Sequence, residues 1–240
     1  IGIKANFLID DNRAVWSSRL YDLAYQNLQK NQNDQFQISW FNVLISCSET
    51  EQEINNLKLI LSGDLKFRNL IIDQEKRWNI VIKLSAYGDI DYKALIDKEK
   101  NNDPGDIGEK RAFTALVSVP DPKAKKAYWD MFVSKEQHKS TSYLTNGMEG
   151  FFWYKQRGIL SSYVALFFEN IIDIYKNKDV HYSSNLSSIL FPDTMDVQVV
   201  LDKTIRFLKE NRNIPKLCKK SLIEQSDNLK RRVKILKNQR

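Results

Sequence analysis

Three helix-start signals follow one another at close spacing, and they constrain what this chain can fold into more than any other feature does. They are Asp73 before Gln74-Glu75-Lys76-Arg77-Trp78, Asp106 with Glu109 three residues on, and Asp121 with Pro122 directly behind it. The side-chain oxygen of each aspartate can accept hydrogen bonds from the unpaired amides of a first helical turn. Proline lacks a backbone N–H, and it is favoured at the first helical position because an N–H there would have no partner within the helix. The pattern predicts short helices stacked into an all-helical array.

Helical periodicity continues along most of the chain. Gly88 and Asp103-Pro104-Gly105 end helices between the three starts. We expect helices, to within a few residues, at roughly 22–30, 36–47, 49–61, 74–87, 92–101, 107–118, 122–133, 141–149, 159–176, 181–190, 197–211 and 215–236. Ser48 with Glu51 is the predicted cap of the third helix, and Asp196 and Pro215 open the last two. Short connections make successive helices antiparallel neighbours.

Residues 1–22 give the weakest helical signal. Ile3–Ile9 and Ala14–Leu20 alternate imperfectly between apolar and polar residues around Asp10-Asp11-Asn12-Arg13. This pattern leaves open a short β-hairpin at the N-terminus.

The helix predicted after Asp73 is apolar over most of its circumference. Trp78, Val81 and Ile82 share one face, Ile80, Leu84 and Tyr87 share another, and the polar stripe consists of Lys76, Asn79 and Lys83. Such a helix must contact neighbours on two sides, so Trp78 is predicted to be buried between helices. The charged run Glu75-Lys76-Arg77 is explained as the exposed charges of a capped first turn rather than as a binding cluster.

Composition excludes several other classes of protein. The 240 residues are 42% hydrophobic and include only 8 Gly and 5 Pro, too few for the turns of a sandwich or barrel. The longest apolar run, Tyr163–Tyr175, is broken by Glu169 and Asp173 and is shorter than a membrane span, so we expect no membrane partner. The chain opens Ile-Gly-Ile, without Met or a basic-then-apolar signal segment. We expect a piece of a longer, cytoplasmic protein.

The net charge of +7 is concentrated at the C-terminal end. Between Asn213 and Arg240 the acidic residues are Glu224 and Asp227, so this segment carries the whole net charge. Its nine basic residues are Lys216, Lys219, Lys220, Lys230, Arg231, Arg232, Lys234, Lys237 and Arg240. A patch for nucleic acid is one explanation. We favour a terminal helix with a solvated basic face, because no aromatic residue is interleaved for base stacking, and an apolar stripe runs along it: Leu222, Leu229, Val233 and Leu236.

The residue types that bind metals or act as nucleophiles are sparse. Cys47 and Cys218 lie far apart in helical patterns and are expected to be reduced, packing thiols. His138 is expected in a surface loop and His181 in the first turn of a helix, and neither spacing resembles a ligand pair. The aromatic run Phe151-Phe152-Trp153-Tyr154 is expected to pack between helices rather than to line a groove. We therefore predict no catalytic residue and no metal ligand in this chain, and the sequence leaves its substrate-binding residues unknown.

Several segments resemble one known family in the same order. They are Asp73-Gln74-Glu75-Lys76-Arg77-Trp78, the run from Asn102 to Ala112, Pro120-Asp121-Pro122-Lys123-Ala124-Lys125, Tyr163 to Phe168, Leu190-Phe191-Pro192 and Ser226-Asp227-Asn228-Leu229-Lys230-Arg231. Together they resemble the C-terminal helical domain, similar to that of endoplasmic-reticulum aminopeptidases, of bacterial zinc aminopeptidases of the aminopeptidase N family. Leu8-Ile9-Asp10-Asp11-Asn12 and Arg19-Leu20-Tyr21-Asp22 resemble the segment by which that family leaves a β-sandwich domain.

The resemblance implies both a fold and a role. The fold is all-α, an irregular α-solenoid of antiparallel helix pairs similar to a HEAT or armadillo superhelix. Residues 1–22 would end the linker from a β-sandwich domain, and residues 23–240 would form the helical domain. The role is non-catalytic: closing a chamber over the active site and restricting access to peptides. The implied partners are the catalytic and β-sandwich domains of the same polypeptide and the peptide substrate.

The chemistry would lie elsewhere in that polypeptide. The family binds zinc through His-Glu-x-x-His and a later Glu, which His138 and His181 cannot supply. We expect no cofactor in this chain and zinc in the parent protein, a hydrolase that removes N-terminal residues. Asn146-Gly147-Met148-Glu149-Gly150 resembles the family's Gly-x-Met-Glu-Asn substrate motif, but both end residues differ and no zinc helix follows, so we interpret it as coincidence.

A different class of function stays open. A free-standing basic α-solenoid scaffold could use its C-terminal end to bind a protein or RNA partner. A His-Glu-x-x-His segment upstream in the same reading frame would decide between the two hypotheses.

Overall fold

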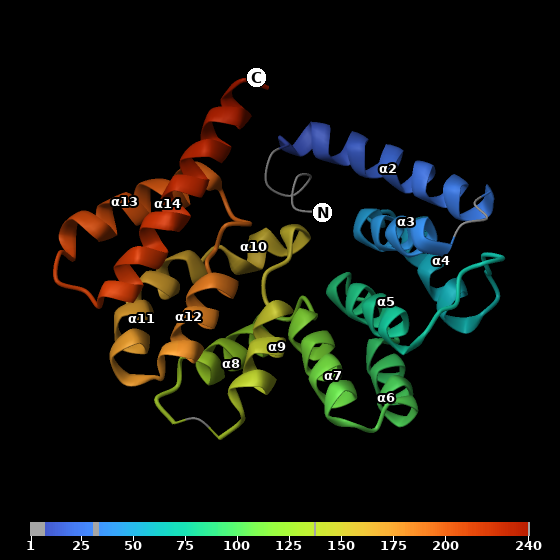
Figure 1. Cartoon of the computed structure of the whole chain (residues 1–240), viewed down its shortest axis with the longest axis horizontal. Helices are drawn as coiled ribbons and strands as arrows, with labels where there is room; N and C mark the ends of the chain where they lie inside the picture. The colour runs from blue at the N-terminus through green and yellow to red at the C-terminus, as the bar shows by residue number, and fades with distance from the viewer. Residues whose placement is uncertain (1–7, 31–33, 137, 240) are drawn as a thin grey trace. The chain divides into compact units, whose positions relative to one another are not determined.

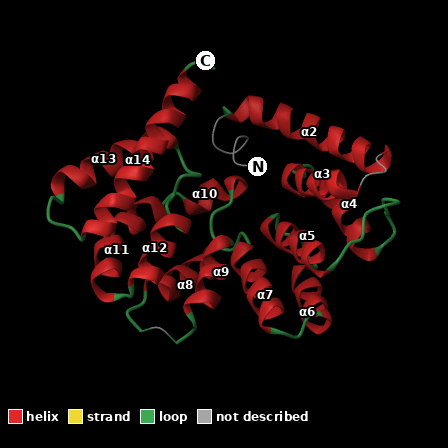
Figure 2. Cartoon of the chain, in the orientation of Figure 1, coloured by secondary structure: helices red, strands yellow, loops and turns green. Residues whose placement is uncertain are grey.

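The structure is a computed structural model that describes residues 8–30, 34–136 and 138–239, apart from the side chains of residues 10, 11, 34 and 35. The chain divides into two compact units, Ile1–Ala112 and Phe113–Arg240. Within the described residues all regular structure is helical (Figure 2). The predicted all-α class is confirmed, and the solenoid arrangement stays a prediction.

The first unit is built around α5. In Figure 1, α2 packs along α3, and α5 contacts α3, α4 and α6. Trp78 on α5 is 1% exposed, so the prediction that this helix is enclosed by neighbours is confirmed. The helices are α2 (Asp10–Lys30), α3 (Asp34–Cys47), α4 (Glu51–Ser62), α5 (Gln74–Ala86), α6 (Tyr92–Asn102) and α7 (Asp106–Ser118), the last of which continues into the second unit.

The second unit packs its last helix, α14, against α11, α12 and α13. Its core is rich in aromatic residues: the Phe151 ring contacts Trp129, Phe132 and Tyr163 at centroid distances of 5.6, 6.2 and 4.9 Å. The elements are α8 (Pro122–Val133), α9 (Thr141–Glu149), the 3-10 helix η1 (Tyr154–Gln156), α10 (Arg157–Leu160), α11 (Tyr163–Asn177), α12 (Val180–Ile189), α13 (Val197–Glu210) and α14 (Lys216–Lys237).

Most of the predicted caps are present. The Asp73 carboxylate accepts from the Lys76 amide, and Asp121 accepts from the amides behind Pro122. Asp196 caps α13 in the same way. Gly88 has φ 74°, the left-handed conformation that glycine adopts at the end of a helix.

The cap of α4 differs from the prediction. Thr50, not Ser48, is the N-cap, and its hydroxyl accepts from the Glu53 amide while the Glu53 carboxylate accepts from the Thr50 amide. Ser48 instead donates to the Leu44 carbonyl, one turn back in α3. Two Ser/Thr-x-x-Glu patterns overlap here, Ser48 with Glu51 and Thr50 with Glu53. Because the Ser48 hydroxyl is bonded to the last turn of α3, Thr50 is the residue that caps α4.

The predicted β-hairpin is wrong where the structure describes it. Ala14–Leu20 lies inside α2, which begins at Asp10 and runs through the proposed boundary at residue 22. Most of the other predicted strand lies outside the described residues. Arg13, Ser17 and Tyr21 are buried at four-residue spacing, so burial of a helical face overrides the imperfect alternation. The assignment of residues 1–22 to a linker stays a prediction.

The long helix predicted at residues 159–176 is broken. α10 ends at Leu160 and α11 begins at Tyr163, and the segments on either side of the break meet at an angle of 79°. Among the described residues no single helix is long and apolar enough to cross a membrane, while this bent pair reaches the required length and composition only when its two parts are taken together.

Candidate functional site

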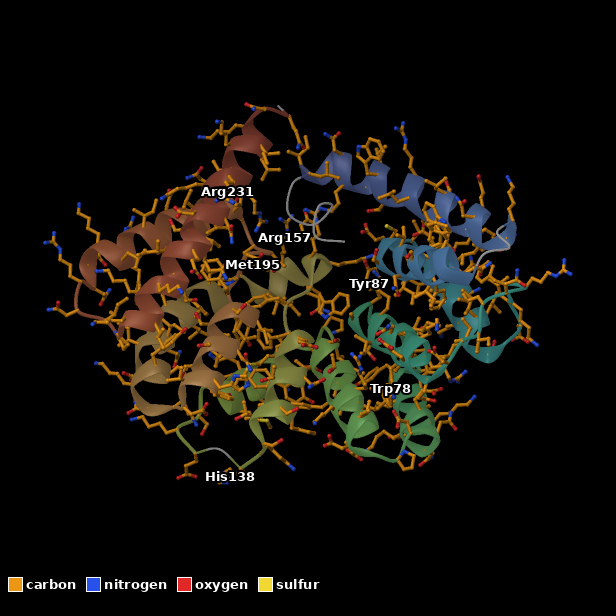
Figure 3. All side chains as sticks on the ribbon, in the orientation of Figure 1. Trp78, Tyr87, His138, Arg157, Met195 and Arg231 are labelled. Carbon is orange, nitrogen blue, oxygen red and sulfur yellow. The ribbon has the colours of Figure 1, made fainter. Side chains whose placement is uncertain are left out.

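The predicted histidine and cysteine positions agree with the structure. His138 projects from the loop between α8 and α9 and is exposed (Figure 3), and His181 lies exposed in the first turn of α12. Cys47 and Cys218 are free and buried, and burial raises the pKa of the Cys218 thiol to about 11. Across residues 8–30, 34–136 and 138–239, no group of three or more His, Cys, Asp or Glu side chains could hold a metal ion.

The first two segments of the family resemblance meet at the buried carboxylate of Glu99 on α6, to which Arg77 of the first segment and Asn102 of the second both donate. Arg77 donates to both carboxylate oxygens of Glu99, at 2.8 Å from Nε and 2.5 Å from Nη2. Burial opposes ionisation of Glu99, but hydrogen bonds from Arg77, Gln74 and Asn102 outweigh it and hold the pKa of Glu99 below its ordinary value. Arg77 is therefore not the exposed first-turn charge that the sequence predicted, because its partner lies on another helix.

Trp78 and Gly108 belong to the same region of contact between α5 and the turn that joins α6 to α7. The indole Nε1 of Trp78 donates to Asp103 Oδ2 at 3.0 Å. A Cβ on Gly108 would lie 1.8 Å from the Asp103 carbonyl oxygen, so only glycine fits. The resembling residues thus fasten the α6–α7 turn to α5.

Lys83 also departs from its predicted exposure. It was expected on a polar stripe, yet only 5% of the residue is exposed. Its ammonium donates to the Ser46 carbonyl at 3.3 Å and lies 4.3 Å from the centroid of the Tyr87 ring. Its long side chain reaches from α5 to the end of α3, where the Ser46 carbonyl accepts a hydrogen bond from the ammonium.

Lys125, in the third resembling segment, is the most deeply buried charged group of the second unit. It is 0% exposed, and its Nζ donates to the carbonyl oxygens of Val117, Gly150 and Phe151 at 2.7, 3.3 and 2.6 Å. Burial lowers its pKa to about 7. The three acceptors match the three donors of an ammonium, so this side chain ties the end of α7 and the end of α9 to α8.

Replacing Lys125 by methionine is expected to lower the free energy of unfolding by about 2–4 kcal/mol, because buried carbonyl groups lose their donor.

The same side chain should make stability depend on pH. In the unfolded chain the Lys125 ammonium has a pKa of about 10.4, so between pH 7 and 10 the unfolded state binds more protons than the folded state. The contribution of Lys125 to stability should therefore rise with pH, by at most about 1.4 kcal/mol per unit, so the loss in Lys125→Met should grow from pH 7 to pH 9. Urea titrations at pH 7, 8 and 9 measure both effects.

The matched control for that substitution is Lys126→Met. Lys126 is exposed and pairs only with Asp130 on the same helix, so its loss should change stability by less than about 0.5 kcal/mol at every pH. Equal losses in the two variants would contradict the structural role of Lys125.

The segment that resembles a substrate motif is a helix contact. A Cβ on Gly147 would lie 2.1 Å from the Phe113 ring, and one on Gly150 would lie 2.3 Å from the Thr114 carbonyl oxygen. Met148 is buried and Glu149 is exposed. Close packing of α9 on α7 therefore accounts for these glycines, and the interpretation of the motif as coincidence stays a prediction.

The aromatic run after α9 is divided between two environments. Phe151 is 0% exposed, which agrees with the packing role predicted for it. Phe152, Trp153 and Tyr154 are partly exposed. The Arg157 guanidinium lies 3.9 Å from the Tyr154 ring centroid and donates to its hydroxyl.

The basic C-terminal helix has the predicted apolar stripe. Leu222 and Leu229 are buried, while Val233 and Leu236 are partly buried. Arg232 departs from the prediction of a solvated face: it is 6% exposed, and its Nη1 donates to the Asp193 carbonyl at 2.6 Å. Asp193 directly follows Leu190-Phe191-Pro192, one of the segments of the family resemblance. This segment therefore also helps to hold a helix, α14, in place.

Each unit carries an open hollow on its surface. In the first unit, a hollow of about 470 Å³ lies beside the end of α4 and the loop of residues 63–72, with Arg77 in its wall. Phe67 forms part of its apolar lining, and Lys66 and Arg68 are exposed at it. In the second unit, a hollow of about 380 Å³ lies along α13, between Val199 and Glu210. The first combines apolar surface with cationic groups, which suits an apolar group that carries a negative charge.

Helices fastened to one another by buried charged and aromatic side chains define the class of all-helical domains. The sequence profile described as ERAP1-like C-terminal domain matches residues 6–231, and the chain belongs to this family. Aminopeptidase N of Streptomyces lividans is 26% identical to it over 177 residues, which cover 72% of this chain and 20% of that protein. The chain therefore spans about a fifth of the length of this curated relative.

Sequence reasoning missed the distant partners of three cations, Arg77, Lys125 and Arg232. Each stands next to or within a segment of the family resemblance, and each binds a group far away in the sequence. The only signal available was the presence of a cation beside apolar residues, which is equally typical of an exposed face.

Proposed function

We propose that this chain is the non-catalytic C-terminal domain of a zinc aminopeptidase, and that it closes a chamber over the active site of the catalytic domain. The observation that carries the proposal is the family match over residues 6–231. The similarity to an Aminopeptidase N supports an aminopeptidase as the parent protein. The catalytic step, removal of an N-terminal residue, would belong to the rest of that polypeptide.

The residues of this chain do not fit the zinc ion of such an enzyme. The sequence has only two histidines, His138 and His181, without a His-Glu-x-x-His spacing. Both are exposed and lie on different segments, and neither belongs to a potential metal cluster within the described residues. Zinc and its ligands would therefore come from the catalytic domain.

The physical role proposed for this domain is exclusion. A wall of packed helices keeps bulk water and large substrates away from a metal-activated nucleophile, and its opening and closing can limit turnover. Rigid anchors such as Arg77–Glu99 and Lys125 suit such a wall, because a wall that discriminates by size must hold its shape.

The isolated chain is expected to show no peptidase activity. With added zinc it should release no more product from an amino-acid anilide than buffer does, because it lacks the ligands that bind and activate the metal. The parent protein should cleave the anilide and lose activity with a chelator. Stoichiometric zinc binding with turnover by the isolated chain would contradict the assignment.

The enclosing role needs a separate test on the parent protein. Removing residues 1–240 should reduce its discrimination between a short peptide and a long unfolded polypeptide, measured as the ratio of kcat/KM for the two. An unchanged ratio in a truncated protein that still hydrolyses the anilide would contradict chamber closure and leave the aminopeptidase assignment in place.

A further inference from the structure

The hollow at the end of α4 is shaped by the turn that ends this helix. Gly63 has φ 87°, a left-handed conformation that suits glycine, and its amide donates to the Leu59 and Ile60 carbonyls. The Leu65 amide also donates to the Leu59 carbonyl, at 2.9 Å, so the chain turns back against the last turn of α4. The loop of residues 63–72, which joins α4 to α5 (Figure 1), then borders a hollow of about 470 Å³ within the first unit.

Three contacts hold the walls of this hollow in place. The Phe67 ring packs edge-on against Tyr25 of α2, at a centroid distance of 5.6 Å and an interplanar angle of 81°. The Leu70 amide donates to the Phe67 carbonyl at 3.2 Å, which closes a turn in the loop. Arg77 Nη1 donates to the Leu61 carbonyl at 3.1 Å and joins α5 to the last turn of α4. Because the walls are fixed in this way, a ligand can bind without a large cost of ordering them.

The hollow has an apolar floor and a cationic rim. Ile60, Leu61 and Phe67 are at most 6% exposed and form the floor. Lys66 and Arg68, on either side of Phe67 in the sequence, are exposed and lie at the rim. Among the described residues that line the hollow there is no aspartate or glutamate.

The two rim cations are the uncompensated charges of this site. Arg77, the third cation of the lining, is already paired with Glu99. Lys66 and Arg68 make no ion pair within the part of the chain that the structure describes. Asp64 of the same loop lies outside the lining and accepts from a serine hydroxyl of α4 at 2.6 Å. The opening of the hollow is therefore positively charged.

We propose that this hollow binds a small apolar carboxylate, a molecule that carries one carboxylate on an aliphatic or aromatic body. The body displaces water from the apolar floor, and the carboxylate accepts hydrogen bonds from Lys66 and Arg68 at the rim. The volume lies within the range of about 300–1,000 Å³ that is typical of small-molecule sites. The site does not depend on the proposed function, since every group in it belongs to the first unit.

A titration of the isotope-labelled chain with phenylbutyrate, followed by NMR, tests the site. The amide signals of residues 60–72 should shift with a Kd of about 1 mM, the affinity expected for a ligand of this size. Phenylbutanol has the same body without the charge, and it should bind about tenfold more weakly. Acetate has the charge without the body, and it should leave these signals unchanged.

The double substitution Lys66→Gln with Arg68→Gln should weaken phenylbutyrate binding by about tenfold or more. Both side chains are exposed, so the fold should be unchanged, and thermal unfolding checks this. The matched control, Lys216→Gln with Lys219→Gln, removes the same charge from exposed positions of α14. It should leave the Kd within about twofold of the unmodified chain, because these positions are remote in sequence from the hollow and their charges are screened by salt.

Three results would overturn the inference. The first is no shift of the signals of residues 60–72 at a phenylbutyrate concentration about tenfold above the expected Kd. The second is equal affinity for phenylbutyrate and phenylbutanol, which would remove the role of the rim cations. The third is equal weakening in the two double variants, since the attraction would then come from the net charge of the chain. The comparison of the two probes uses the unmodified chain, so it decides the question even if a variant fails to fold.

Discussion

Replacing Trp78 by alanine is expected to lower the free energy of unfolding of the chain by about 3–5 kcal/mol, the range for removing a large aromatic side chain from a core. Trp78 is 1% exposed and lies on α5, the helix that contacts α3, α4 and α6. Its loss leaves a cavity and also deprives Asp103 of the indole donor. Chemical denaturation followed by circular dichroism measures the change.

Two variants separate the contributions in that experiment. Trp78→Phe keeps most of the apolar volume but removes the hydrogen bond to Asp103, so its loss should be clearly smaller than that of alanine. Ile90→Ala removes apolar atoms from a residue that is 90% exposed, and it should change stability by less than about 0.5 kcal/mol. If Trp78→Ala cost below about 1 kcal/mol, the central position of α5 would be wrong.

Replacing Leu229 by aspartate is expected to be about as destabilising, by about 3–5 kcal/mol, because it removes buried apolar surface and places a carboxylate in the core. Leu229 is 1% exposed in the aromatic-rich core of the second unit, beneath the basic face of α14. The substitution therefore tests whether this helix is held by its apolar stripe. Thermal unfolding at neutral pH gives the result.

The control for Leu229→Asp must reverse charge without touching a buried group. Arg231 and Lys234 are exposed, and the double reversal Arg231→Glu with Lys234→Glu should cost less than about 1 kcal/mol. The pair Arg231 and Arg232 is unsuitable, because Arg232 is buried against Asp193. Sub-micromolar, sequence-selective RNA binding at physiological salt that this double reversal abolishes would favour the scaffold hypothesis over the aminopeptidase domain.

Local signals in the sequence predicted most helix boundaries of this protein. Asp73, Asp121 and Asp196 were recognisable as caps because a capping carboxylate acts on amides two or three residues away. Gly88 was recognisable for the same reason, since the left-handed conformation is a property of one residue. These interactions are complete within a single turn, so the sequence contains all of their partners.

The same local reasoning failed where two patterns of similar strength competed. The Ser48 and Thr50 patterns overlap, and only the end of α3 decides that Ser48 returns to Leu44. In Ala14–Leu20 an imperfect alternation suggested a strand, while the burial of Arg13, Ser17 and Tyr21 on one face of α2 requires a helix. A weak local preference yields to the larger free energy of burying a face against neighbouring helices.

The sequence by itself determined the helical class, most of the caps, the burial of Trp78 and the lack of a zinc-binding motif, because these depend on spacing along the chain. Only the tertiary structure decided that Arg77, Lys125 and Arg232 are anchors rather than surface charges. A charge is stable in the interior only when acceptors from other segments surround it. Those acceptors come together only when the chain has folded.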